Sequence, residues 1–486
     1  MFNNPLVKKY FQQKNLPQDI GLTFEDVVII DQYSKIASRK DINNIQARIA
    51  EGIVLSAPFV SANMDTITES QMAIALARLG GMGVIHQFLP ISRRVAEVKK
   101  VKRADNFIIS HPLTITEDKT LKHAKALMEQ YQVYGLLVTR KEKLVGILSH
   151  RDYYLETDDH KKVKELMTSK NLVTAPHTIS FAKAKQIFNR TKKEKLPLVD
   201  SHGQLKGLIC AKDVLKRSQY PDAFRDQYGR LGVAAAVGIG KEMIKEIGEL
   251  LQVEVDGIVI DTARGNCQRL ENKIKEARKK YGKKLVLMAG NIDTPEACER
   301  LIKAGANCVK VGIGGGAACK TRVGTGVGIP QITAVAACTA VAKKYNVGVI
   351  ADSGVKSGAD FCKALAAGAN AVMSGSLCAG TKETPGEIFY EDGREWKLFR
   401  GSASLEFQVS RVDRQNPEEN VRTPEGVTKR IPYKGSITTV VKELMGYLRS
   451  SMSYVGVTNL DEFHQQAVFM RQTIAGLNEG KPHDTN

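Results

Sequence analysis

The sequence predicts an α/β protein, a (β/α)₈ barrel built from two separated parts of the chain with a smaller repeated region inserted between them. Outside residues 108–216, eight short apolar segments flanked by glycine alternate with helix-like stretches. Inside residues 108–216 the sequence repeats itself at a constant offset. We therefore expect a discontinuous barrel domain of residues 1–107 and 217–486, and a separate inserted domain of residues 108–216.

The bulk composition narrows the class of protein. The chain has 486 residues, 43% hydrophobic and 25% charged, as in globular proteins with several domains. It shows no membrane-length apolar run and no signal pattern, which predicts a cytoplasmic protein that does not bind membranes. The net charge of +19 comes from lysines along helix-like stretches, and aromatics are only 6%. This favours small phosphate-bearing substrates over nucleic acid. The eight cysteines have neither metal-ligand nor disulfide spacing, which is typical of reduced thiols.

The eight predicted strands are nearly continuously apolar, as expected for parallel strands buried on both faces. They are Pro58–Ser61, Gly83–His86, Val233–Val237, Gly257–Asp261, Leu285–Met288, Cys308–Val311, Val347–Ile350 and Ala371–Ser374. Because barrel chemistry lies on the loops that follow the strands, we expect the functional residues immediately after these segments.

The loop after the sixth predicted strand is the strongest candidate site. It has glycine at four of the five positions Gly312–Gly316, followed by Cys319 and Arg322. Glycines let the backbone turn tightly and approach a ligand closely. A cysteine among backbone dipoles and beside an arginine is suited to act as a nucleophile. A lone cysteine in such a loop is more often inert, but the barrel context favours the nucleophile.

Polar residues or glycines follow other predicted strands. They include Asn63–Asp65, Asp261–Thr262, Gly290–Asn291, Asp352–Gly354 and Gly375–Ser376. Glycine loops after the last two strands are where barrels bind phosphate, and a carboxylate such as Asp352 suits a ribose diol. Each segment alone is equally consistent with a turn. Together they predict a nucleoside monophosphate site that faces Cys319.

The inserted region contains two copies of one unit. Gly135–Val138 recurs as Leu196–Val199, and Leu144–Asp152 recurs as Leu205–Asp213. Each copy predicts a helix, two strands joined by a turn, and a second helix. This pattern resembles a tandem pair of CBS domains.

The CBS resemblance implies that ATP or GTP binds the inserted region. In those domains a hydroxyl residue and an aspartate at the second strand–helix junction contact the nucleotide. These positions correspond to Ser149 and Asp152 in the first copy and to Asp213 in the second. Cys210 replaces the second hydroxyl, and a spacer without a ligand is the alternative.

Nearly the whole chain resembles the IMP dehydrogenase/GMP reductase family. The matching segments are LTFEDVVII, SANMDTITES, GGMGVIHQF, RLGVAAAVG, MAGNIDT, VKVGIGGGAACKTRVGTGVGIPQ, IADSGV, AVMSGSLCAGTKETPGE, FRGSAS, RTPEGV, YKGS, GYLRSSMSYVG and AGLNEGKPHD. The resemblance implies a TIM barrel oxidoreductase of purine metabolism, with NADPH or NAD as cofactor, that assembles as a homotetramer or octamer.

The resemblance also implies roles for individual residues. In this family a cysteine thiolate adds to C2 of the purine and a nicotinamide exchanges hydride there; the cysteine is Cys319. Thr321 and Glu425 are the expected proton-transfer partners, and Arg414 or Arg411 is the expected flap arginine. The expected substrate-binding residues are Asp352, Ser353, Gly354, Gly375, Ser376, Gly401, Ser402, Arg422 and Gly426, and the expected cofactor-binding residues are Asp261, Asn291, Gly312 and Gly314.

A potassium ion is a further implication of the resemblance. It would lie at the backbone of Gly314, Gly316 and Cys319. In this family a C-terminal Glu-Ser-His of a neighbouring subunit completes the site, whereas this chain has Glu479–Lys481. The Lys481 ammonium group is therefore a candidate substitute for the ion, or else a solvated residue of the tail.

Departures from the family pattern bear on the direction of the reaction. The flap segment EFQVSRVDRQNPEENVRT contains no tyrosine, whereas dehydrogenases use an Arg-Tyr pair to activate water. Ala62–Asp65 and Arg422–Gly426 also resemble reductases, although Gly375–Ser376 and the insert resemble dehydrogenases. We therefore expect a GMP reductase, which converts GMP and NADPH to IMP and ammonia. The alternatives are an IMP dehydrogenase, which converts IMP and NAD to XMP, and an inactive barrel that senses nucleotides.

Overall fold

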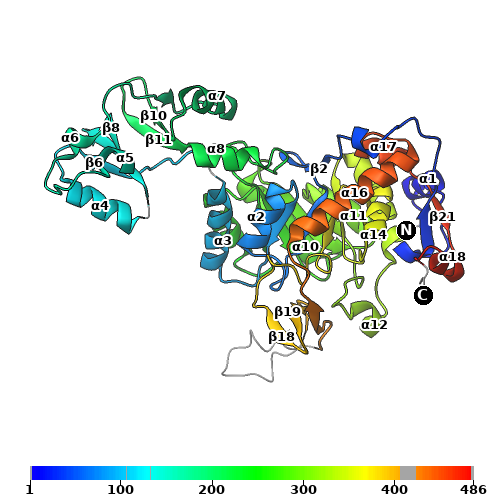
Figure 1. Ribbon diagram of the computed structural model, residues 1–486. Coiled ribbons are helices and arrows are strands. Elements are labelled where there is room, and N and C mark those ends of the chain that lie inside the picture. The colour runs from blue at the N-terminus through cyan, green and yellow to red at the C-terminus, as the bar shows by residue number, and fades with distance from the viewer. Residues whose placement is uncertain (1–2, 106, 132, 405–422, 483–486) are drawn as a thin grey trace. The chain divides into compact units, whose positions relative to one another are not determined.

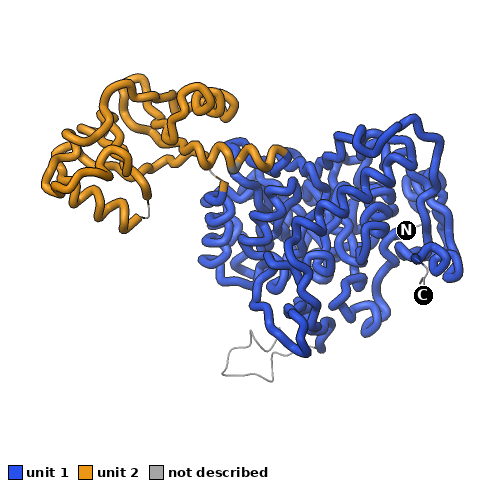
Figure 2. The backbone as a smooth tube through the Cα atoms, viewed as in Figure 1, with its two compact units in different colours: residues 1–104, 222–486 blue, residues 105–221 orange. Residues whose placement is uncertain are grey.

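The computed structural model describes residues 3–105, 107–131, 133–404 and 423–482. Contacts divide the chain into two compact units, residues 1–104 with 222–486, and residues 105–221 (Figure 2). Each unit is held by hydrophobic cores of its own.

The larger unit is a closed barrel of eight parallel strands, which confirms the predicted fold class. The strands follow one another around the barrel as β12 (Ala234–Val237), β13 (Gly257–Asp261), β14 (Leu287–Ile292), β15 (Cys308–Val311), β16 (Gly348–Asp352), β17 (Ala371–Ser374), β4 (Phe59–Ser61) and β5 (Met82–Ile85). All eight coincide with predicted segments, but β14 begins two residues later than expected and continues through Gly290 and Asn291. Ordinary backbone pairing with β13 carries the strand on to the polar edge of the barrel.

Helices surround the barrel and cover its apolar strands (Figure 1). They are α2 (Ser70–Arg78), α3 (Ile91–Ala104), α9 (Met243–Gln252), α10 (Gln268–Tyr281), α11 (Pro295–Ala304), α13 (Gln331–Ala342), α14 (Gly358–Ala366) and α16 (Ile437–Val455). Every residue of α13 is buried, so this helix needs cover on its outer side as well. The N-terminal helix α1 (Pro5–Gln13) packs against it, and the Tyr10 hydroxyl donates to the carbonyl of Ala367 at 3.1 Å.

Additional elements lie at the carboxyl end of the barrel strands. The short helix α12 (Thr321–Thr325) belongs to the long connection between β15 and α13. The strands β18 (Phe389–Glu391), β19 (Arg394–Arg400) and β20 (Thr428–Pro432) form an antiparallel sheet between β17 and α16. Figure 1 shows α12 and this sheet along the same edge of the unit.

The smaller unit consists of two similar halves. In the first half, β7 (Gly135–Arg140) lies between parallel β6 (Thr114–Thr116) and antiparallel β8 (Lys143–Ser149). In the second half, β10 (Lys195–Val199) lies in the same way between β9 (Ala175–Pro176) and β11 (Leu205–Cys210). The helices are α4 (Leu121–Gln130), α5 (His150–Tyr153), α6 (Val163–Leu166), α7 (Phe181–Thr191) and α8 (Ala211–Ser218).

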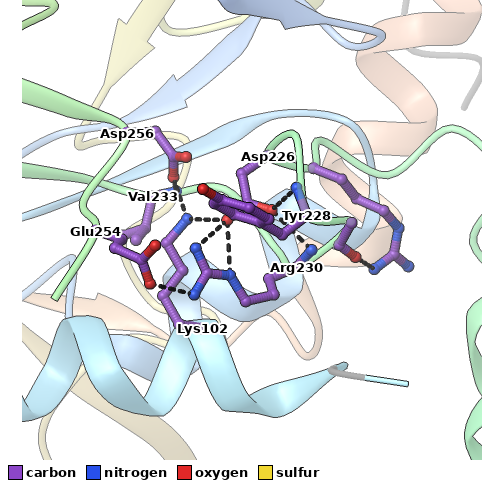
Figure 3. A network of polar contacts seen from close by, with 9 residues as sticks. Lys102, Asp226, Tyr228, Arg230, Val233, Glu254 and Asp256 are labelled. Carbon is purple, nitrogen blue, oxygen red and sulfur yellow. Dashed lines mark hydrogen bonds and ion pairs between the residues drawn. The ribbon is translucent and has the colours of Figure 1, made fainter. Parts of the chain in front are cut away.

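An ionic network joins the two parts of the chain that form the barrel unit (Figure 3). Lys102, near the end of α3, donates to Asp226 at 2.9 Å and to Asp256 at 2.7 Å. Arg230 donates to Asp226 at 2.8 Å and to Glu254 at 2.5 Å. Burial raises the pKa of Asp256, although Lys102 favours its charged form. The network therefore fixes the chain just before it leaves the barrel and just after it returns.

Among the described residues, no helix is long and apolar enough to cross a membrane. That same part of the chain contains no group of three or more His, Cys, Asp or Glu side chains arranged to hold a metal ion.

Candidate active site

The glycine loop after β15 has a backbone that only glycine adopts readily. Gly312 has φ +141° and Gly314 has φ +75°, and a Cβ atom at Gly312 would lie 2.1 Å from the carbonyl oxygen of Asp352. The end of β14 fixes the start of the loop, because the Gly312 N–H donates to Ile292 at 2.9 Å and its carbonyl accepts from Asn291 Nδ2 at 2.8 Å. The loop therefore leaves the barrel in one defined direction.

Cys319 is the one exposed thiol among the eight cysteines, all of which are described. Its Sγ lies 3.3 Å from Thr321 Oγ1, and the Thr321 hydroxyl donates to Glu425 Oε2 at 2.6 Å. Three of the four predicted catalytic residues thus form one chain of hydrogen bonds; the fourth, Arg414, lies outside the described residues. Such a chain can carry the thiol proton through a hydroxyl group to a carboxylate, which leaves a thiolate.

Glu425 reaches this position because its segment pairs with the cysteine loop. The Lys320 N–H donates to the Glu425 carbonyl at 2.7 Å, and the Val427 N–H donates to the Ala318 carbonyl at 3.0 Å. Gly401 and Gly426 permit the close approach, since a Cβ atom at Gly401 would lie 2.5 Å from the Ala318 oxygen and one at Gly426 would lie 2.8 Å from the Ser404 nitrogen. Ser402, between them in the chain, is half-buried.

Lys310, a lysine on β15 whose side chain is only 2% exposed, was not among the residues expected from the sequence. Its Nζ donates to Asp261 at 2.8 Å, to Asp352 at 3.0 Å and to Asn63 at 3.2 Å. Burial opposes the charge, but the two carboxylates outweigh it, and the pKa of Lys310 lies above its usual value. One buried cation therefore joins the predicted ribose-binding and cofactor-binding aspartates. A charged residue within an otherwise apolar strand was the available signal.

The loops after β16 and β17 lie beside the glycine loop. Ser353 and Gly354 both have positive φ, +81° and +78°. A Cβ atom at Gly315 would lie 3.2 Å from Ser353 Oγ, so the two loops are in close contact. The Ser376 hydroxyl, which follows Gly375, donates to the Val355 carbonyl at 3.0 Å. The predicted phosphate-binding residues therefore lie at the same end of the barrel as Cys319.

In the smaller unit, a cavity of about 280 Å³ contains Ser149 and Asp152. Asp152 accepts hydrogen bonds from the Ser149 N–H and hydroxyl, both at 2.6 Å, and from Thr168 at 2.7 Å. The second half of the unit contributes Lys192, Lys193 and Lys195, a basic wall that suits phosphate. Asp213, on α8, is not among the residues that line this cavity.

Residues 21–483 match the model of a protein family described as the IMP dehydrogenase / GMP reductase domain.

The chain belongs to this family. It is an NAD(P)-dependent oxidoreductase of the IMP dehydrogenase/GMP reductase family, as the resemblance predicted.

Curated relatives of this family carry the dehydrogenase name. The chain is 44% identical over 470 residues to inosine-5'-monophosphate dehydrogenase of Aquifex aeolicus, covering 96% of this chain and 95% of the relative. It is 43% identical over 469 residues to the Bacillus subtilis enzyme of the same name, covering 96% of each. These names favour the dehydrogenase alternative over the reductase that we expected from the flap.

Solved structures of GMP reductase from Trypanosoma brucei are also similar to the chain. The complex with guanosine 5'-monophosphate is 36% identical, with a TM-score of 0.85, and covers 98% of this chain and 100% of that one. The complex with guanosine 5'-triphosphate is 33% identical, with a TM-score of 0.75, and covers 95% and 99%.

The remaining expected family residues lie in the flap, at the potassium positions and near the C-terminus. Arg411, Arg414 and Arg422 lie outside the described residues, so the flap comparison rests on sequence alone. Of the expected potassium positions, the Gly316 carbonyl accepts the Cys319 N–H at 3.0 Å. Lys481 is exposed, and its ammonium group donates to Asn478 at 2.8 Å.

Proposed function

We propose that the enzyme exchanges hydride at C2 of a purine nucleoside monophosphate through a covalent bond to Cys319, and that its reaction is the oxidation of IMP to XMP. The hydrogen-bonded chain from Cys319 through Thr321 to Glu425 is the observation that carries the covalent step. The names of relatives that match almost the whole chain at 43–44% identity support the direction.

The hydrogen-bond donors and acceptors of the site suit both a purine nucleoside monophosphate and a nicotinamide cofactor. Asp352 and Asp261 offer carboxylate oxygens to ribose hydroxyls, and Lys310 holds both in place. The Ser353 N–H donates to the Met373 carbonyl at 3.1 Å, so Gly354 is the residue of this positive-φ turn whose N–H can contact a phosphate. Asn291 donates to Asp352 at 2.8 Å and to Gly312, which ties the substrate side to the cofactor side.

In the proposed reaction the proton of Cys319 passes through Thr321 to Glu425, and the thiolate forms an S–C2 bond with IMP. The nicotinamide, when bound, accepts the hydride from C2. Water then attacks C2, the S–C2 bond breaks, and XMP leaves with the thiol restored. Asp352 orients the ribose throughout, and backbone groups of the glycine loop keep the sulfur near C2. Once Glu425 has released the thiol proton to solvent, it is placed to accept a proton from the attacking water through Thr321, and this proton returns to the departing sulfur.

GMP reduction is the second candidate. The likeness to GMP reductase over 98% of the chain and the absence of tyrosine from the flap favour it. The same thiol would displace ammonia from C2 of GMP, and hydride from NADPH would then release IMP.

Two incubations separate the candidates. The protein is mixed with IMP plus NAD, and separately with GMP plus NADPH, and absorbance of the reduced nicotinamide is followed. We expect NADH and XMP to form in the first mixture. Oxidation of NADPH by GMP, without XMP formation from IMP, would reverse the assignment. The inactive-barrel alternative requires that neither mixture reacts and that no purine nucleotide protects Cys319 from alkylation.

We also propose that ATP or GTP binds the smaller unit, because its cavity joins the Ser149–Asp152 pair with a lysine-rich wall. A homotetramer or octamer, and a potassium ion at the backbone of Gly314, Gly316 and Cys319, remain predictions from the family resemblance. Light scattering and the potassium dependence of activity test them.

A further inference from the structure

Asp293 is a buried carboxylate beside the active-site loop that the proposed reaction does not use. It lies in the turn between β14 and α11 and is 5% exposed. Its Oδ2 accepts the backbone N–H of Ile329 at 2.8 Å, whereas its Oδ1 is buried without a hydrogen-bond partner. Burying an ionisable group with an unsatisfied oxygen costs stability, so a buried aspartate at position 293 needs a functional or structural explanation.

Arg322, the last residue of the cysteine motif, donates hydrogen bonds to backbone carbonyls at both ends of the loop. One terminal nitrogen, Nη2, donates to the carbonyl of Ile313 at 3.0 Å and to the carbonyl of Ile329 at 2.7 Å. Ile313 and Ile329 stand on either side of the segment that carries Cys319. A single nitrogen of the guanidinium group therefore bridges the two ends of that segment.

Asp293 and Arg322 act on the same residue. Asp293 accepts from the N–H of Ile329, and Arg322 donates to its carbonyl. Burial raises the pKa of Asp293 to about 6, although the amide of Ile329 and the charge of Arg322 favour the carboxylate. The two side chains therefore support each other electrostatically at the closing point of the loop.

We propose that Asp293 is a positioning residue that, together with Arg322, holds the loop between Ile313 and Ile329 in the shape that presents Cys319. The inference rests on the proposed function for the importance of Cys319, but not on which purine reaction is run. Asn291 fixes only the start of the loop at Gly312, whereas Asp293 fixes its far end. When Asp293 takes up a proton, Arg322 loses its charged partner and the far end of the loop relaxes.

The surroundings of Asp293 contain few other groups that titrate near neutral pH. Arg322 on the loop stays charged. The thiol of Cys338 on α13 interacts with Asp293, but burial raises the pKa of this thiol well above its usual value, so it stays neutral. Glu296, in the first turn of α11, acts on the same thiol. A change in loop behaviour near pH 6 would therefore report Asp293.

The test compares Cys319 alkylation in the wild-type chain and in Asp293→Asn. The full chain is treated with iodoacetamide from about pH 5 to about pH 8, and the Cys319 peptide is quantified by mass spectrometry. We expect the variant to react ~3-fold faster or more at pH 8, with a kcat about tenfold lower and a KM for nucleotide nearly unchanged. The rate ratio should fall to one at pH 5, where wild-type Asp293 is also neutral. A ratio that is independent of pH overturns the proposal, because a general loss of structure would not follow this titration.

Two further variants keep the test decisive if Asp293→Asn folds poorly. Arg322→Lys keeps the charge, but its shorter side chain withdraws the donor from both carbonyls, so it should accelerate alkylation at every pH; an unchanged rate contradicts the inference. Glu246→Gln is the matched control, because Glu246 of α9 pairs with Arg94 of α3 at 2.6 Å and does not contact the loop. If neither IMP nor GMP is turned over but the pH-dependent ratio appears, the proposed function fails while the loop inference stands.

Discussion

Replacing Lys310 by methionine tests whether one buried cation organises the active site. Methionine approximates the volume of the lysine stem but leaves Asp261 and Asp352 without the ammonium group that lies 2.8 and 3.0 Å from them. Removing one partner of a buried ion pair typically costs about 3–5 kcal/mol, because the remaining charge stays desolvated. Asp261 and Asp352 are 21% and 14% exposed, so water compensates only in part. We expect Lys310→Met to lower the free energy of unfolding by about 3 kcal/mol at pH 8.

Urea unfolding, followed by circular dichroism, measures this change, and the matched control is Lys303→Met. Lys303 pairs with Glu299 at 3.0 Å on the surface of α11, and its side chain is 63% exposed, so its loss should cost less than about 1 kcal/mol. A loss below about 1 kcal/mol at pH 8 would refute the idea that Lys310 holds two charged aspartates.

Three other substitutions test the site and the smaller unit. Cys319→Ser should lower turnover on the order of 10³-fold or more while nucleotide binding, measured by calorimetry, is retained. Cys267→Ser, at the N-terminus of α10, is the control. Substantial turnover by the Cys319 variant would contradict covalent catalysis. Asp293→Asn should raise the free energy of unfolding above pH 6. The pKa of Asp293 is raised from 3.8 to about 6, so its stabilising contribution is complete below about pH 4 and is lost as pH rises through 6, a cost of about 3 kcal/mol that asparagine does not incur. Equal stability of the two proteins at pH 8 in urea titrations would argue against that burial cost. Asp152→Ala should weaken ATP or GTP binding by ~10-fold or more, since three hydrogen bonds to its carboxylate are lost. Asp213→Ala, outside the cavity, should have little effect. If calorimetry shows that Asp213→Ala weakens binding more than Asp152→Ala, the nucleotide does not bind in this cavity.

The barrel was predictable because parallel strands buried on both faces carry a signal in the chain itself. Each of the eight apolar runs overlaps an observed strand. Strand ends were less accurate: β14 continues through Gly290 and Asn291, because pairing with a neighbouring strand, and not side-chain polarity, decides where a ladder stops. The polar residues expected at the carboxyl edge follow from the same pattern, since every parallel strand ends there.

Contacts between residues far apart in the chain could not be derived from local pattern. Thr321 and Glu425 were paired only through the family resemblance, because nothing in either segment indicates the antiparallel contact that brings them together. Lys310 and Asp293 were missed because a lysine in a strand and an aspartate in a turn are ordinarily solvated. Their burial depends on which way the barrel turns each side chain. The direction of the reaction depends on few side chains within a shared framework, so the flap sequence and the names of relatives point to different sister enzymes.

The ionic network around Lys102 has a consequence for the order of events during folding. β5 pairs with β12 through Val84 and Ala234, and the whole smaller unit is synthesised between them. The first two barrel strands, β4 and β5, pair with each other, but their outer partners β17 and β12 leave the ribosome much later, so one backbone edge of each strand stays exposed until then. If the smaller unit folds during this interval, its two ends are brought together, and the loop that must close for β5 to pair with β12 becomes much shorter. The ion pair between Lys102 and Asp226 can therefore form only after the smaller unit has been synthesised. A smaller unit that folds slowly would delay closure of the barrel, even though the two units have separate cores.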